Sequence, residues 1–178
     1  MNNVEKALQD FRKYVVQQSR YNLTKGNHNV TKSLYNTVNV EVKKMPNSIS
    51  IYFDLGDYGA FQDQGVKGAN PSLVKNGKQK APNSPFRFKD KKPPVAPLIK
   101  WAKFRGIRFR NEKGQFEKGG YTSIGFWLQK RIYAQGLKPT LFFTKPFRKG
   151  LERLPEEMVT AYGLEAEDLL RTILIPKK

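Results

Sequence analysis

The middle of the chain, residues 64–94, contains few apolar side chains and many Lys, Pro, Asn and Gly residues. A segment this long without an apolar pattern is unusual inside a compact domain, and such segments are usually functional or disordered. The hydrophobic core is therefore expected to come from the segments on either side. We interpret residues 66–93 as a long extended basic arm that cannot pack on its own domain, closed by Pro93 and Pro94.

The net charge of +18 is unevenly distributed along the 178 residues. Thirteen Lys or Arg residues and a single acid, Asp90, lie between Gln64 and Asn111. This basic middle predicts contact with nucleic acid phosphates or with an acidic protein surface, although a solvated basic face that only aids solubility is the alternative. The basic residues of the arm are Lys67, Lys75, Lys78, Lys80, Arg87, Lys89, Lys91 and Lys92.

The C-terminal part of the chain is acidic. Its carboxylates are Glu152, Glu156, Glu157, Glu165, Glu167 and Asp168. A basic middle and an acidic end on one chain indicate two faces with different partners.

The sequence lacks most of the residues that the common catalytic chemistries require. Cysteine is absent and His28 is the single histidine, so disulfides and thiol chemistry are excluded and histidine-based metal or triad chemistry is not expected. Asp54, Asp57 and Asp63 match no two-metal spacing and are interpreted as turn and cap acids. We therefore expect neither enzymatic activity nor a cofactor.

The chain contains no run of 18 apolar residues and its N-terminus has no apolar core segment. We therefore expect neither a transmembrane helix nor a signal peptide, and no contact with a membrane.

Three segments have helical periodicity: residues 3–22, 96–105 and 123–135. Trp101 and Trp127 lie on the apolar faces of the second and third, which predicts that both are buried against a sheet. An alternative is a single-strand-binding surface, in which exposed aromatics alternate with basic residues. The residues of that alternative are Phe86, Phe88, Phe104 and Phe109 with Arg87, Arg105, Arg108 and Arg110.

Residues 33–42 and 49–55 alternate between apolar and polar side chains, which predicts a β-hairpin. Residues 140–144 are expected to add a strand. The predicted fold is α+β: a single domain over residues 1–178, with a twisted, mostly antiparallel sheet packed by the N-terminal helix and the two central helices. Residues 153–178 are expected to form an acidic helical segment.

Residues 58–68, YGAFQDQGVKG, follow the second strand of the predicted hairpin. We interpret them as a shaped loop, because their glycines permit a sharp turn. A larger residue at Gly65 is expected to impair assembly more than folding. The loop residues proposed to contact a neighbouring subunit are Tyr58, Phe61, Asp63, Gly65 and Gly68.

Four pieces of the sequence, in this order, resemble the small neck and tail-completion proteins (head–tail joining, tail-terminator-like) of tailed bacteriophages. The pieces are the N-terminal helix followed by NLT at 22–24 and SLYNTV at 33–38; YGAFQDQG at 58–65; PVAPLIKWAKFRGI at 94–107 with the helix at 124–134; and PTLFFTKPF at 139–147.

The resemblance implies a structural virion protein, made in the host cytoplasm and incorporated in the neck or tail. Such proteins form homo-oligomeric rings around the DNA channel, between the portal or adaptor and the tail proteins, where non-specific contact with packaged DNA is possible. The alternative from another class is a basic nucleic-acid-binding protein without a virion role.

Overall fold

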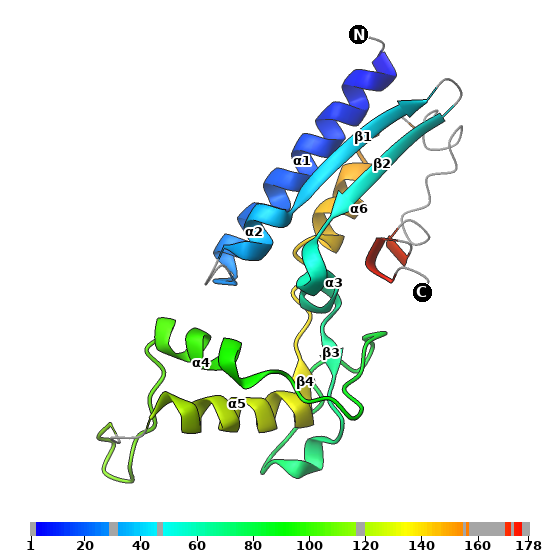
Figure 1. Cartoon of the computed structure of the whole chain (residues 1–178). Coiled ribbons are helices and arrows are strands. Elements are labelled where there is room, and N and C mark those ends of the chain that lie inside the picture. The colour runs from blue at the N-terminus through cyan, green and yellow to red at the C-terminus, as the bar shows by residue number, and fades with distance from the viewer. Residues whose placement is uncertain are drawn as a thin grey trace. The chain divides into compact units, whose positions relative to one another are not determined.

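The computed structural model describes residues 3–28, 32–45, 48–116, 120–154, 156, 170–171 and 173–175. The fold is α+β and mostly helical, with two small antiparallel two-stranded sheets among the described residues (Figure 1). The α+β class is confirmed, whereas the predicted single twisted sheet is wrong. The elements are α1 (Asn3–Lys25), α2 (Ser33–Thr37), β1 (Asn39–Met45), β2 (Ser48–Asp54), α3 (Gly56–Gln64), β3 (Val66–Lys67), the 3-10 helix η1 (Pro71–Leu73), α4 (Val95–Phe104), α5 (Tyr121–Gln135), β4 (Gly136–Leu137) and α6 (Thr144–Leu151).

The chain divides into two compact units. Unit 1 comprises Met1–Asp63 and Thr140–Lys178, and unit 2 comprises Gln64–Pro139. Unit 2 is therefore an insertion between two segments of unit 1. The predicted acidic segment at 153–178 falls largely outside the described residues.

Unit 1 is built on α1 and the β1–β2 hairpin, which lie side by side (Figure 1). The hairpin confirms the prediction and pairs Asn39 with Asp54 and Met45 with Ser48. One face of α1 is buried at helical spacing, as predicted for an amphipathic helix. The buried residues of this face are Leu8, Phe11, Val15, Ser19 and Leu23.

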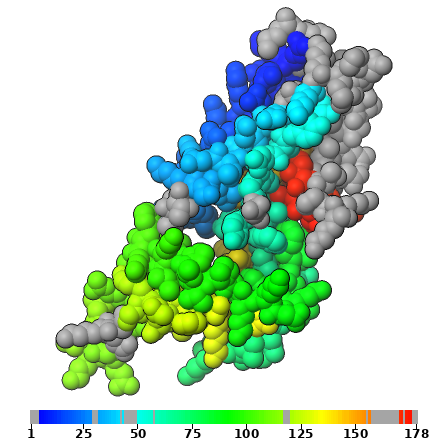
Figure 2. Space-filling view, viewed as in Figure 1, coloured from blue at the N-terminus to red at the C-terminus, as the bar shows by residue number. Residues whose placement is uncertain are grey.

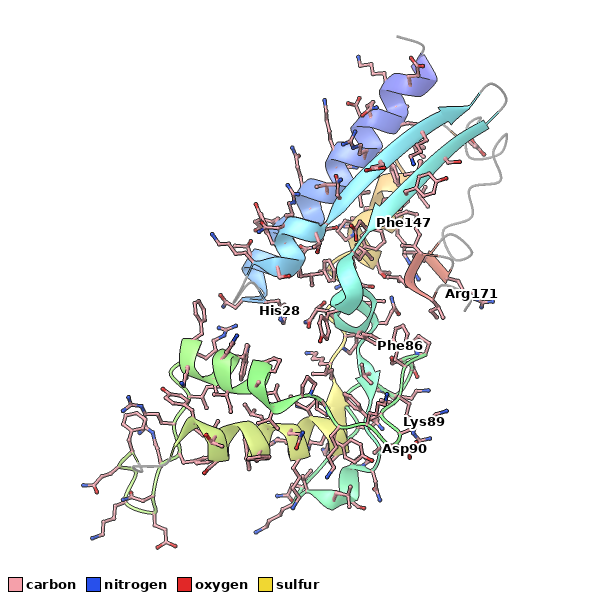
Figure 3. All side chains as sticks on the ribbon, in the orientation of Figure 1. His28, Phe86, Lys89, Asp90, Phe147 and Arg171 are labelled. Atoms are coloured by element: carbon pink, nitrogen blue, oxygen red, sulfur yellow. The ribbon has the colours of Figure 1, made fainter. Side chains whose placement is uncertain are left out.

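Helix α6 completes the core of unit 1 with aromatic side chains. Phe147 lies edge-on to Phe11 of α1 and to Phe53 of β2, with ring centroids 5.7 and 5.3 Å apart (Figure 3). Phe143, just before α6, lies 5.2 Å from the same Phe53. Each such pair contributes about 0.5–1.5 kcal/mol beyond the area it buries. The cluster therefore stabilises the packing of α1, the hairpin and α6 against one another.

Asp63 is the last residue of unit 1 before the insertion, and its side chain is fully buried. Its Oδ1 accepts hydrogen bonds from the backbone N–H groups of Phe143 (2.8 Å) and Thr144 (3.1 Å), and its Oδ2 accepts one from the Thr144 hydroxyl. These donors lie at the start of α6, where N–H groups lack helical partners and a negative charge is favoured. The Asp63 carbonyl also accepts from Leu141 N–H at 3.0 Å. Asp63 therefore joins the two points at which the chain leaves and re-enters unit 1.

In unit 2, β3 pairs with β4, so the two ends of the insertion lie together. Gly65 has a φ of +70°, and a Cβ there would lie 2.4 Å from the carbonyl oxygen of Leu137. A Cβ at Gly68 would lie 2.1 Å from the carbonyl oxygen of Ala134. Both glycines permit backbones to approach closely inside the unit. They do not shape an exposed loop, because both are buried.

Helices α4 and α5 pack against each other and match the predicted central helices (Figure 1). Gly125 of α5 allows the close approach, since a Cβ there would lie 2.5 Å from Cγ1 of Ile99. The expectation that Trp101 and Trp127 are buried against a sheet is wrong. Trp101 is half-buried and Trp127 is 43% exposed, whereas the buried residues of the two helices are Ala102, Ile124, Gly125, Ala134 and Gln135.

Residues 66–93 do not form the predicted extended arm. The side-chain amide of Gln79 accepts a hydrogen bond from Gly68 N–H at 2.7 Å and donates one to the Gly68 carbonyl at 3.3 Å. The Ser84 hydroxyl donates to the carbonyl of Gly65 at 2.7 Å. Polar side chains thus anchor this segment on unit 2 by satisfying backbone groups, which a count of apolar residues does not detect.

Three other predicted segments differ from the structure. Residues 33–37 form α2, residues 58–64 lie in α3, and 140–144 is a turn entering α6. Asp54 Oδ1 accepts from Gly56 N–H at 2.9 Å at the start of α3, so Asp54 and Asp63 are the turn and cap acids expected. Residues 140–144 make no strand because their N–H groups bond to the segment ending at Asp63.

Replacing Asp63 by Ala should destabilise unit 1 by about 3 kcal/mol or more, because buried donors at the start of α6 lose their acceptor. Urea denaturation followed by far-UV circular dichroism measures this loss. Asp10→Ala, which removes an exposed carboxylate from α1, is the control and should change the midpoint little. An Asp63→Ala midpoint equal to that of the control would contradict the assigned role.

Replacing Gly65 by Ala should destabilise unit 2 itself, which corrects the expectation that assembly would be affected first. The left-handed backbone costs about 1 kcal/mol for a residue with a Cβ, and the clash with the Leu137 carbonyl adds to it. Gly106→Ala is the matched control, because Gly106 has a φ of +61° but nothing within 4 Å of an added Cβ. Thermal melting followed by tryptophan fluorescence reports on unit 2, which contains both tryptophans. Equal losses in the two variants would show that the close approach is unimportant.

Candidate nucleic-acid interface

The positive charge of the protein is concentrated in unit 2. Residues 64–139 contain 18 Lys or Arg and three acids, whereas the rest of the chain contains 15 Lys or Arg and 12 acids. Unit 2 therefore has a net charge of +15 and unit 1 a net charge of +3. Three carboxylates, Asp90, Glu112 and Glu117, cannot neutralise 18 cations. Most of the cations of this unit remain available to an anionic partner.

The basic residues predicted for the arm lie on the folded loops of unit 2. Lys67 is half-buried because it lies in β3. Lys89 and Asp90 lie on the loop that leads to α4 (Figure 3). The exposed members of the predicted set are Lys75, Lys78, Lys80, Arg87, Lys89, Lys91 and Lys92. The sequence thus identified basic side chains that are exposed, but it predicted the wrong backbone beneath them.

Lys80 lies close to a second cation, Arg131. Partial burial of its ammonium group, together with the positive charge of Arg131, lowers the pKa of Lys80 from its usual 10.5. Its backbone N–H is fixed to the Gln135 carbonyl at 2.9 Å, and Arg131 Nε donates to Gln135 Oε1 at 3.3 Å. The two cations are therefore held near each other by the end of α5. A bound anion would relieve their repulsion.

Aromatic side chains are exposed among these cations. Phe104, Phe116, Phe126 and Trp127 are between 43% and 68% exposed, all within residues 104–127 of unit 2. Of the aromatics that the sequence suggested for single-strand binding, Phe104 is exposed, whereas Phe86, Phe88 and Phe109 are half-buried. Phe116 and Phe126 were not among the candidate residues that the sequence suggested, and Trp127 was predicted to be buried. In the sequence, these aromatic residues are marked only by their position close to the Arg-rich segment at 105–110. Whether their side chains are exposed depends on how α4 and α5 pack, which the sequence pattern does not show.

The five residues predicted for a subunit-interface loop do not form one loop. Tyr58 and Phe61 lie on α3 of unit 1, one helical turn apart, and are 69% and 41% exposed. Asp63 is buried at the end of the same helix. Gly65 and Gly68 are buried in unit 2. Only Tyr58 and Phe61 of this set present substantial apolar surface.

Among the described residues, no group of three or more His, Cys, Asp or Glu side chains is placed to hold a metal ion. None of the helices in the described ranges is long and apolar enough to cross a membrane. Comparisons of the chain with protein-family models, with curated proteins and with solved structures found no match.

Replacing Lys80 by Gln should raise the stability of the protein at neutral pH. The folded-state pKa of Lys80 lies below its unfolded value of 10.5, so its charged form opposes folding at pH values below the folded pKa. This cost disappears as the pH rises through the folded pKa towards 10.5. Urea denaturation should therefore show an advantage for Lys80→Gln at pH 7 that shrinks at alkaline pH.

The matched control is Lys78→Gln, which removes an exposed lysine from the same loop. It should change stability little at either pH. If Lys80→Gln is no more stable than Lys78→Gln at pH 7, the repulsion assigned to Lys80 and Arg131 is absent.

Proposed function

We propose that the protein is a structural virion component of the neck or tail of a tailed bacteriophage. In this role it forms a homo-oligomeric ring that joins the portal or adaptor to the tail around the DNA channel, and unit 2 supplies the surface that faces nucleic acid. The proposal assigns it no catalytic role. It rests on the ordered sequence resemblance over most of residues 4–152, since that is the feature that points to a virion rather than to nucleic acid alone.

The structural observation that carries the proposal is the separation of charge between the two units. The net charge of unit 2 is +15 and that of unit 1 is +3. Phosphate contacts of Lys and Arg need no base sequence and supply most of the affinity of non-specific binding. A strongly basic unit 2 inserted in a nearly neutral unit 1 suits a subunit in which unit 2 contacts DNA of any sequence while unit 1 contacts other proteins.

Ring formation requires each subunit to contact its neighbour through two different surfaces. The exposed apolar pair Tyr58 and Phe61 on α3 is one candidate surface. The acidic residues at 152–168 offer charge complementary to that of a basic unit 2 in the next subunit. Both features favour head-to-tail contacts between copies of the chain.

A nucleic-acid-binding protein without a virion role is the second candidate. The same observation favours it, because unit 2 has the charge and exposed aromatics of a binding surface without reference to any ring. The two candidates differ in what Tyr58 and Phe61 do: in a ring they are covered by a neighbour, and in a monomeric binding protein they are not.

Mass photometry of the purified chain, with and without DNA, should show closed rings of one defined size. The double variant Tyr58→Ala/Phe61→Ala should shift the population to single subunits, because it removes exposed apolar surface from α3. Lys75→Gln/Lys78→Gln should affect ring formation much less than the double variant on α3, because it removes only two of the 18 cations of unit 2. For the lysine variant, the slope of the logarithm of the DNA-binding constant against the logarithm of the salt concentration should become less steep by about 0.9 for each phosphate that the variant no longer neutralises.

A chain that remains monomeric at all concentrations, alone and on DNA, and that binds DNA tightly would support the second candidate and contradict the ring. A ring that shows no salt-dependent DNA affinity would contradict the role given to unit 2.

A further inference from the structure

The loop between α4 and α5 and the neighbouring part of α5 present exposed aromatic rings with guanidinium groups close by. Residues 107–116 extend past the ends of these two helices (Figure 1) and form the lobe at the lower left of Figure 2. The loop is folded back by the bridge between Arg110 and Phe116 and by the turn in which Asn111 N–H donates to the Gln115 carbonyl at 2.9 Å. It is therefore a short hairpin with a defined register.

We call each exposed aromatic ring on which a flat partner could stack a platform, and Phe116 forms the first. Its ring is 56% exposed, and the guanidinium carbons of Arg110 and Arg108 lie 4.6 and 5.9 Å from the ring centroid. Arg108 and Arg110 are two residues apart, and both side chains lie on the side of the backbone that faces Phe116. The bridge opposite Arg110 brings Phe116 to that side.

Trp127 forms the second platform on α5. Its ring is 43% exposed, and the guanidinium of Arg131, one helical turn further on, lies 5.2 Å from the ring centroid. Phe109 connects the two platforms, because its ring lies edge-on to Trp127 at 5.8 Å while its neighbours in sequence cover Phe116. Phe109 thus fixes the hairpin to the helix.

The chemistry of this surface selects its partner. Residues 103–131 carry eight Lys or Arg and two Glu, so the partner is anionic. The exposed parts of these rings and the planar guanidinium groups beside them can each stack on a flat π-system, which favours a partner that carries such systems at regular intervals. Unpaired nucleotides supply both, one phosphate and one base each, and base stacking on aromatic side chains is the usual way in which proteins bind single strands.

We propose that Phe116 and Trp127, with Arg108, Arg110 and Arg131, form a binding site for single-stranded nucleic acid in which bases stack on the two aromatic rings. In a duplex the bases are already stacked, so the exposed rings would contribute little to its binding. The inference does not depend on a virion role, since it concerns unit 2 of a single chain. Ring formation and strand binding can each fail independently of the other.

The test is fluorescence anisotropy of the full-length chain with labelled oligo(dT), compared with a labelled duplex of equal length at the same low salt concentration. Oligo(dT) should bind more tightly than the duplex and should quench tryptophan fluorescence, and heparin, a polyanion without bases, should not quench it. Phe116→Ala should weaken oligo(dT) binding by about fivefold or more, the loss expected for one stacked base. It should leave heparin binding unchanged.

Tyr52→Ala is the matched control, because Tyr52 is also an exposed ring with a cation over it, Lys43 at 5.1 Å, but lies in unit 1. It should not change oligo(dT) affinity. Far-UV circular dichroism checks that both variants are folded, and Trp127→Phe, which keeps an aromatic ring, should retain affinity while losing most of the quenching. Equal binding of oligo(dT) by Phe116→Ala and the unmodified chain, tighter binding of the duplex, or no binding at all would each overturn the proposal.

Discussion

The hydrogen bonds of the buried Asp63 carboxylate are the contact on which the arrangement of unit 1 depends. They satisfy the first N–H groups of α6 and hold together the two positions between which all 76 residues of Gln64–Pro139 are inserted. Removing the acceptor would leave donors buried without partners, which costs more than a neutral hydrogen bond contributes. The aromatic cluster of Phe11, Phe53 and Phe147 can form only with α6 in this place, so the carboxylate and the core support each other.

Insertion of one unit into another separates two physical tasks within one chain. Unit 1 has the apolar core and a nearly balanced charge, whereas unit 2 has few apolar residues in its loops and a net charge of +15. Mutual repulsion among so many cations disfavours a compact unit. Hydrogen bonds from Gln79 and Ser84 to backbone groups, the pairing of β3 with β4 and the packing of α4 on α5 oppose that repulsion. An anionic partner would relieve it, which is the physical basis of the proposed contact with nucleic acid.

Periodic apolar patterns predicted the elements that pack by a continuous face. The stripe from Leu8 to Val15 and the alternation at 49–55 identified α1 and β2, and the central helices were found within a few residues. Long-range polar contacts escaped prediction: the amide of Gln79 on Gly68 and the carboxylate of Asp63 on α6 lie 11 and 80 residues apart in sequence. The basic residues of the candidate surface were predicted, but the exposure of the rings of Phe116 and Trp127 was not. The exposure of Trp127 depends on which face of α5 meets α4, and that of Phe116 depends on how the loop at 107–116 folds.

The central claim is that unit 2, and not unit 1, contacts nucleic acid. Ultraviolet cross-linking of the full-length chain to DNA, followed by mass spectrometry of the attached peptides, tests it most directly. The account predicts that the cross-linked peptides map within Gln64–Pro139, with the residues around Phe116 and Trp127 among them when the DNA is single-stranded. Cross-links confined to Met1–Asp63 and Thr140–Lys178 would contradict it.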